Sequence, residues 1–193
     1  YFFSCSWYEV YDFIEFVVNS YDVIYINDKY KSRCNSILES DMSAYRFVDN
    51  IISPIIENEE INEIEKAIET LSYEPVKKHL KSALEKLSDR ETPDYRNSIK
   101  ESISAVEALC KIISGKKKST LGEALKIIES EKGILIHSSL NEAFKKLYGY
   151  TSDEGGIRHA MIDDNKKVKQ EDARFMLIAC SAFVNYLIDK MKD

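Results

Sequence analysis

The residues with the clearest capacity for chemistry are Arg158 and His159, which follow a pair of glycines in the run GGIRH. An imidazole titrates near neutral pH, so His159 can move a proton while the adjacent guanidinium of Arg158 holds a phosphate. Tyr148 and Tyr150 lie just upstream and offer hydroxyl groups or ring faces to a nucleic acid base. The pattern predicts acid–base chemistry on a phosphate group.

A purely structural explanation of the same pair stays open. Arg158 can form an ion pair with Asp153, Glu154 or Asp163, and His159 can cap a helix. Ion pairs of this kind also perturb titrating groups and need no catalytic role. From the residues alone, this is the simpler explanation.

A second polar motif, GKKKST at residues 115–120, has the appearance of the end of a phosphate-binding loop. The upstream glycine of such loops is absent, and no strand precedes the motif. Glycine commonly ends a helix and serine commonly starts one. We therefore expect Gly115 and Ser119 to lie between two helices, without a nucleotide site.

The remaining carboxylates and histidines give no metal or catalytic pattern. Glu101 and Glu107 share a predicted helix, but no histidine or second acidic pair accompanies them in the sequence. His79 lies on a polar helix and His137 precedes a helix start, and neither has a chemical neighbour in the sequence. We predict no metal and no cofactor.

Composition favours a helical, folded chain. Of the 193 residues, 44% are hydrophobic and 31% charged, with only six glycines and three prolines, which argues against disorder and against a turn-rich sandwich. The net charge of −6 does not attract nucleic acid by bulk electrostatics. Any RNA contact must be local, and lysine runs at 116–118 and 166–169 are more typical of solvated helix ends.

The cysteines and the first helix indicate a reducing, cytoplasmic environment. The four cysteines, at positions 5, 34, 110 and 180, lack the close spacing of a zinc site or a redox pair. The aromatic run at residues 1–18 is interrupted by acidic residues and cannot be a membrane span. Because this pattern is already under way at Tyr1, we expect further sequence or a further domain upstream.

The spacing of apolar residues predicts the helices that must position Arg158 and His159. We expect helices over about 94–114, from 121, over 138–148 and from about 171, with residues 149–169 forming a long loop or a short helix between loops. The residues expected to face the core are Ile99, Ile103, Val106, Cys110, Ile113, Leu121, Leu125, Ile128, Leu140, Phe144, Leu147, Phe175, Ile178, Ala182, Phe183 and Tyr186.

The first half predicts a separate helical region. Helices are expected over 2–18, 28–40, 59–71 and 75–87, and two short β-prone runs around Asp49-Asn50 predict a hairpin near 44–55. The segment Ser88 to Asp94 contains Pro93 and is the best linker. We predict an all-α chain with a small hairpin, divided into domains at 1–90 and 91–193.

Several blocks of the sequence together resemble a known family. The blocks AYRFVDN, LSDRETPDYRNSIKESISAVEALCKIISG, STLGEALKIIE, LYGYTSDEGGIRHAM and DARFMLIACSAFVNYLI are similar to the AbiJ N-terminal-domain type of abortive-infection proteins, in the wider HEPN superfamily. The resemblance covers nearly the whole chain and is densest over about 87–188. It implies a HEPN-like helical bundle in an antiphage defence protein.

This resemblance also implies a function and a set of site residues. Many HEPN proteins form homodimers and cut RNA without a metal: the ribose 2′-hydroxyl attacks the phosphate, histidine transfers protons and arginine steadies the charge. The family arginine, expected several residues before His159, is missing. Arg96-Asn97 supplies an arginine and a polar residue, but Glu101 stands where its histidine would be.

Two interpretations therefore remain. In the first, His159, Arg158 and Arg96 form a variant RNase site, with Tyr148, Tyr150 and Asn97 binding RNA. In the second, the domain is a non-catalytic dimerisation or interaction module that regulates an attached effector. The small-residue face around Ala179 and Ala182 on the last helix is the expected dimer contact.

Overall fold

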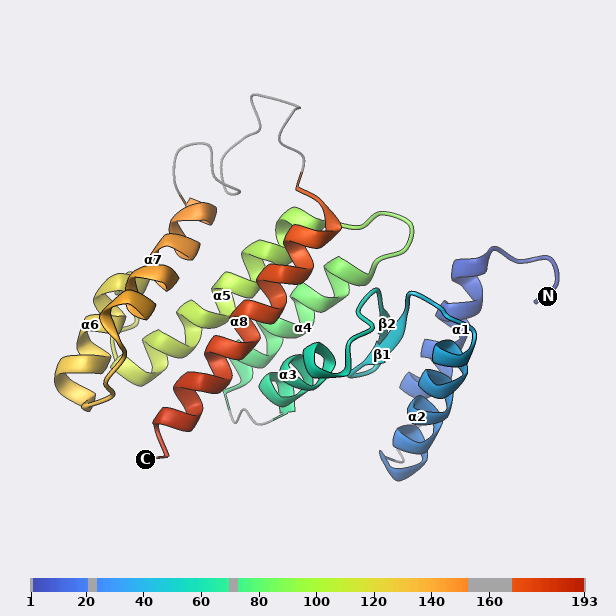
Figure 1. Ribbon diagram of the computed structural model, residues 1–193, viewed down its shortest axis with the longest axis horizontal. Coiled ribbons are helices and arrows are strands. Elements are labelled where there is room, and N and C mark those ends of the chain that lie inside the picture. The colour runs from blue at the N-terminus through green and yellow to red at the C-terminus, as the bar shows by residue number, and fades with distance from the viewer. Residues whose placement is uncertain (1, 21–23, 70–72, 153–167, 193) are drawn as a thin grey trace.

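The computed structural model describes residues 2–20, 24–69, 73–152 and 168–192, which form eight helices and one two-stranded sheet (Figure 1). The predicted helical class with a small hairpin is confirmed. In chain order the elements are α1 (Trp7–Ser20), α2 (Ile24–Ser40), β1 (Arg46–Val48), β2 (Ile51–Ser53), α3 (Asn58–Glu69), α4 (Glu74–Ser88), α5 (Tyr95–Ser114), α6 (Leu121–Lys132), α7 (Ser138–Ser152) and α8 (Gln170–Lys190).

Helices α3 to α8 form a bundle built around α5. Helix α5 packs along α4 on one side and α8 on the other, and α3 crosses α8 and α4 (Figure 1). Helices α6 and α7 pack on each other and on α5. No helix in the described ranges is long and apolar enough to cross a membrane.

Helix α5 confirms the sequence prediction at its core face and at both ends. Its predicted apolar stripe, from Ile99 to Ile113, is buried in the main core. The side chain of Asp94 accepts a hydrogen bond from the Asn97 backbone N–H, which satisfies one of the free donors of the first turn. Gly115 ends the helix with φ +72°, a left-handed angle that glycine adopts without strain.

The core face of α8 differs from the prediction. Phe175 is 58% exposed and Ala182 is also exposed, whereas Met176, Cys180 and Val184 are buried. Helix α8 packs on α3 and α4 as well as α5, so its buried stripe is wide and is turned away from Phe175. Of the residues predicted for this face, Phe183 is fully buried, and Ile178 and Tyr186 are partly buried.

Helix α7 is also longer and less buried than predicted. It extends to Ser152, four residues past the expected end at 148. Phe144 and Leu147 pack against the core, but Leu140 is exposed in the first turn of α7. The prediction for Leu140 was wrong.

The predicted hairpin is present and lies between two cores. Its turn contains Asp49 at φ 53°, a left-handed angle that aspartate tolerates better than most residues. Strands β1 and β2 pair antiparallel, with Phe47 opposite Ile52. These two side chains pack with Val18 of α1 in a small second core, whereas Val48 joins the main core.

Helices α1 and α2, which we call the arm, project from the hairpin at one end of the molecule (Figure 1). Within the described residues α1 contacts α2 and β2, and α2 contacts α1 and β1. The arm side of the small core consists of Val18, with Tyr11, Ile14, Tyr30 and Cys34 partly buried around it.

The predicted break between residues 88 and 94 is confirmed as a loop between α4 and α5. The Asp89 carboxylate accepts backbone hydrogen bonds from Glu91 and Thr92. The main core nevertheless continues across this loop, because α4 and α5 pack along their lengths. The division into domains at residue 90 stays a prediction.

The turn after α2 contains a strained residue. Met42 has φ 53°, and its N–H donates to the Glu39 carbonyl while Ser43 donates to Leu38. This is a helix-ending turn whose left-handed position favours glycine. We expect Met42→Gly to raise the free energy of unfolding by about 0.5–1 kcal/mol, since the relieved strain exceeds the added freedom of the unfolded chain. Urea unfolding followed by circular dichroism measures the change, and an equal or lower stability would contradict this explanation.

Candidate functional site

The predicted catalytic pair, Arg158 and His159, lies outside the described residues. The helix that precedes this pair in the chain is α7, and the helix that follows it is α8. The last turn of α7 carries Tyr148 and Tyr150, and α8 begins at Gln170. Tyr148 packs partly against the main core, whereas Tyr150 is 46% exposed.

The first turn of α5 lies at this same end of the bundle (Figure 1). Burial raises the pKa of Tyr95, and the charge of Glu171 on α8 adds to this effect. Burial likewise raises the pKa of Tyr150, with a further contribution from Asp172. The starts of α5 and α8 and the end of α7 are thus close enough to interact electrostatically, and we call this region the bundle end.

Two predicted site residues, Arg96 and Asn97, belong to the first turn of α5 at the bundle end. Both are half-buried. The Asn97 side-chain amide donates to Asp94 Oδ2 at 2.6 Å. Burial opposes ionisation of Asp94, but hydrogen bonds from Asn97 and the charges of Lys86 and Arg96 together lower its pKa. The Asn97 amide is therefore engaged within its own helix, and its role in binding RNA stays a prediction.

His79 has a chemical neighbour, contrary to the sequence prediction. Its Nδ1 lies 2.6 Å from Glu101 Oε2, which joins α4 to α5 at a partly exposed position. Glu101 stands at the position where the family pattern would have a histidine. Within the described ranges, no group of three His, Cys, Asp or Glu side chains is arranged to hold a metal ion.

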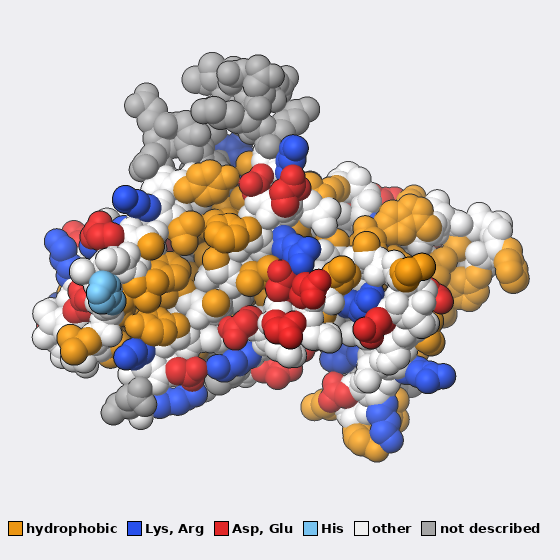
Figure 2. Space-filling view, viewed as in Figure 1, with side chains coloured by type: hydrophobic (Ala, Val, Ile, Leu, Met, Phe, Trp, Pro, Cys, Tyr) orange, Lys and Arg blue, Asp and Glu red, His pale blue; other side chains and the backbone are white. Residues whose placement is uncertain are grey.

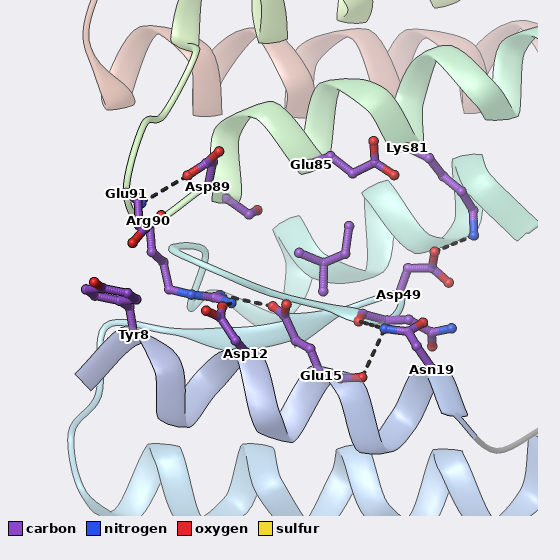
Figure 3. A pocket seen from close by; sticks show the side chains of 13 residues that line it. Tyr8, Asp12, Glu15, Asn19, Asp49, Lys81, Glu85, Asp89, Arg90 and Glu91 are labelled. Atoms are coloured by element: carbon purple, nitrogen blue, oxygen red, sulfur yellow. Dashed lines mark hydrogen bonds and ion pairs between the residues drawn. The ribbon is translucent and has the colours of Figure 1, made fainter. Parts of the chain in front are cut away.

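A polar cleft of about 500 Å³, which the sequence did not suggest, lies between the arm and the bundle (Figure 3). One wall is α1, the second is the hairpin turn, and the third is the end of α4 with the loop that follows it. Its charged side chains are two cations, Lys81 and Arg90, and six carboxylates: Asp12, Glu15, Asp49, Glu85, Asp89 and Glu91.

Arg90 is the central side chain of this cleft and is only 6% exposed. It extends from the loop to the arm (Figure 3), with its two terminal nitrogens 2.5 Å from Asp12 and 3.0 Å from Glu15. It also donates to the Ile52 carbonyl at 2.9 Å, while Glu15 accepts the Ile52 N–H at 2.6 Å. Arg90 and Glu15 together satisfy the backbone N–H and C=O of Ile52 in β2. Burial opposes the charge of Arg90, but these carboxylates raise its pKa, so it stays protonated.

Residues 1–70 match the family AbiJ N-terminal domain 4. The AbiJ N-terminal domain 4 segment comprises the arm, the hairpin and α3. It covers a little more than a third of the chain and precedes residues 87–188, where the sequence resemblance is densest. No curated protein and no solved structure matches the chain.

Among the described residues, polar contacts join the AbiJ N-terminal domain 4 segment to the rest of the chain in two regions. The first is the cleft, where Arg90 contacts α1 and Lys81 pairs with Asp49. The second is the seam between α3 and α8. There Arg174 Nε donates to Glu60 at 2.9 Å, Asn185 donates to Glu63 at 2.8 Å, and Lys66 donates to Asp189 at 3.0 Å.

Proposed function

We propose that this chain is a module of an abortive-infection protein. The match of residues 1–70 to AbiJ N-terminal domain 4 carries the proposal. In this proposal the arm, hairpin and α3 form the family segment, and residues 91–193, from α5 onward, form a HEPN-like helical bundle.

As the activity of the bundle we propose metal-independent RNA cleavage at the bundle end. Support comes from the placement of Arg96, Tyr148 and Tyr150 there, beside the helix ends that precede and follow Arg158 and His159 in the chain. Half-buried and exposed tyrosines at one end of a bundle provide stacking faces for unpaired bases.

The proposed reaction is transesterification by the ribose. His159 takes the proton of the 2′-hydroxyl, and the 2′-oxygen bonds to the adjacent phosphorus. The bond from phosphorus to the 5′-oxygen breaks and leaves a 2′,3′-cyclic phosphate. The departing 5′-oxygen takes a proton, from protonated His159 or from water, and becomes a 5′-hydroxyl. Arg158, with Arg96 from the same or a second chain, stabilises the added negative charge on the phosphate.

The test is an RNA cleavage assay with end-labelled single-stranded RNA in the presence of EDTA. We expect products that end in a cyclic phosphate. An otherwise identical strand with one 2′-deoxy nucleotide at a mapped cut position should resist cleavage there, because the attacking hydroxyl is absent. Cleavage at the deoxy position, or a requirement for a divalent metal, would contradict this mechanism.

The second candidate function is a dimerisation or interaction module without catalysis. It is favoured by the solvent side of α8, where Phe175 and Ala182 are exposed and Ile178, Ala179 and Tyr186 are partly exposed. Figure 2 shows hydrophobic side chains gathered over the region of α7 and α8. A homodimer through this face would bury side chains that the monomer leaves in water.

A further inference from the structure

We propose that the arm is a hinged element which Arg90 latches onto the bundle, so that loss of this contact shifts the arm from a docked toward a released position. This inference concerns the junction between the family segment and the bundle. It does not depend on RNA cleavage at the bundle end, which lies on other helices.

The first observation is how little holds the arm by packing. In the described part of the chain, neither α1 nor α2 packs on any of the helices α3 to α8. The arm is attached through the outer face of the hairpin, where its fully buried apolar contribution is Val18 against Phe47 and Ile52. A core this small buries too little apolar surface to fix the arm rigidly.

The second observation is that the hairpin itself stays with the bundle. Val48 and Ile55 belong to the main core, the Asp49 backbone N–H donates to Glu65 at 2.8 Å, and Lys81 pairs with Asp49 at 2.6 Å. Motion of the arm is therefore expected between α2 and β1, where Met42 turns the chain with a positive φ. The hairpin provides the fixed side of this hinge.

The latch is the contact of Arg90 with α1. Its guanidinium reaches from the α4–α5 loop to Asp12 and Glu15, and it lies 5.8 Å from the centre of the Tyr11 ring. The Nε of Arg90 is buried and has no hydrogen-bond partner among the described residues. The latch is therefore formed by the two terminal nitrogens of Arg90.

Charge makes the latch a switch between two positions. Asp12 and Glu15 on the arm face Glu85, Asp89 and Glu91 of the bundle across the same cleft (Figure 3). Backbone hydrogen bonds from Thr92 and Glu91 lower the pKa of Asp89, so this carboxylate is charged at neutral pH. When Arg90 leaves the arm, like charges on the two walls repel, and the arm moves outward.

Amide hydrogen exchange on the full chain, followed by mass spectrometry, tests the latch. Arg90→Met keeps much of the side-chain length but removes the charge and the donors. We expect exchange in α1 and α2 to become at least about tenfold faster, because charge-assisted hydrogen bonds are lost, while α5 and α8 keep their wild-type rates. Arg90→Lys should give a smaller increase, since lysine retains the positive charge but lacks the planar pair of terminal nitrogens of the guanidinium group.

Arg174→Met is the matched control, because Arg174 joins α8 to Glu60 of α3 with a similar pair of nitrogens. This variant should speed amide exchange in α3 and α8. Exchange in the arm should increase no more than exchange in those two helices. If Arg90→Met changed all helices equally, or left the arm unchanged, the hinged arm would be rejected. An equal increase of exchange in all helices would show that Arg90 stabilises the whole fold and not the arm in particular.

A rescue experiment tests the repulsion. In the triple variant Arg90→Met, Glu85→Gln, Glu91→Gln the bundle wall loses two charges, so exchange in α1 should return toward the wild-type rate. The control triple variant Arg90→Met, Glu57→Gln, Glu131→Gln removes two exposed charges outside the cleft and should exchange like Arg90→Met. Equal exchange in the two triple variants would overturn the switch.

Discussion

Replacing His159 by alanine is expected to lower metal-independent RNA cleavage by about 10²–10⁴-fold, the usual effect of losing an acid–base group. His159 is the histidine of the proposed site, and no other side chain in the run GGIRH titrates near neutral pH. The measurement is the single-turnover rate on end-labelled RNA in EDTA. Unchanged melting temperature would show that the variant remains folded.

His137→Ala is the control for this variant. His137 is exposed at the start of α7, where its Nδ1 accepts a hydrogen bond from the Ser139 N–H, so its loss should leave the cleavage rate within about twofold. Arg158→Lys should reduce cleavage as well, because lysine keeps the charge and loses the planar fork that grips a phosphate. Full activity of His159→Ala would remove His159 from the reaction and favour the interaction module.

Phe183→Ala is expected to lower the free energy of unfolding by about 3–5 kcal/mol. Phe183 of α8 is buried, and its ring stacks on Phe144 of α7 with the ring centres 3.4 Å apart and on Tyr186 at 6.1 Å. Removing it leaves a cavity and takes away a direct side-chain contact between α7 and α8. Urea unfolding at several protein concentrations measures the change.

Phe175→Ala provides the comparison on the same helix. Because Phe175 is largely exposed, its loss should change stability by no more than about 0.5 kcal/mol. A loss of stability that grows with protein concentration would instead indicate self-association through the solvent side of α8. Equal effects of the two variants at every concentration would contradict the assignment of core and surface on α8.

Helix ends and the hairpin could be predicted because their signals are local. Asp94 caps α5, Gly115 ends it, and Thr120 forms a capping box with Glu123 at the start of α6. The hairpin turn needed residues that tolerate left-handed angles, and Asp49-Asn50 supplied them. Cys110, predicted to face the core, is buried, as is Cys180, and burial raises the pKa of both thiols to about 12.

The parts that depend on distant residues could not be predicted. Arg90 meets Glu15 across 75 residues of sequence, and neither position has a local pattern that indicates its partner. His79 meets Glu101 only because α4 packs along α5. The buried side of α8 differs from the prediction for a similar reason. Apolar residues occur on most of its circumference, and the neighbouring helices determine which side is buried.

The placement of α3 affects whether residues 1–70 can fold as a separate recombinant fragment. Ile61, Ile64 and Ile68 of α3 are buried in the main core, against helices that come later in the chain. A recombinant fragment cut at residue 70 would expose these isoleucines, together with Val48 and Ile55, to solvent. The family segment as matched is therefore an incomplete folding unit, and expression of residues 1–70 should yield an aggregating peptide unless residues 73–190 are supplied by fragment complementation.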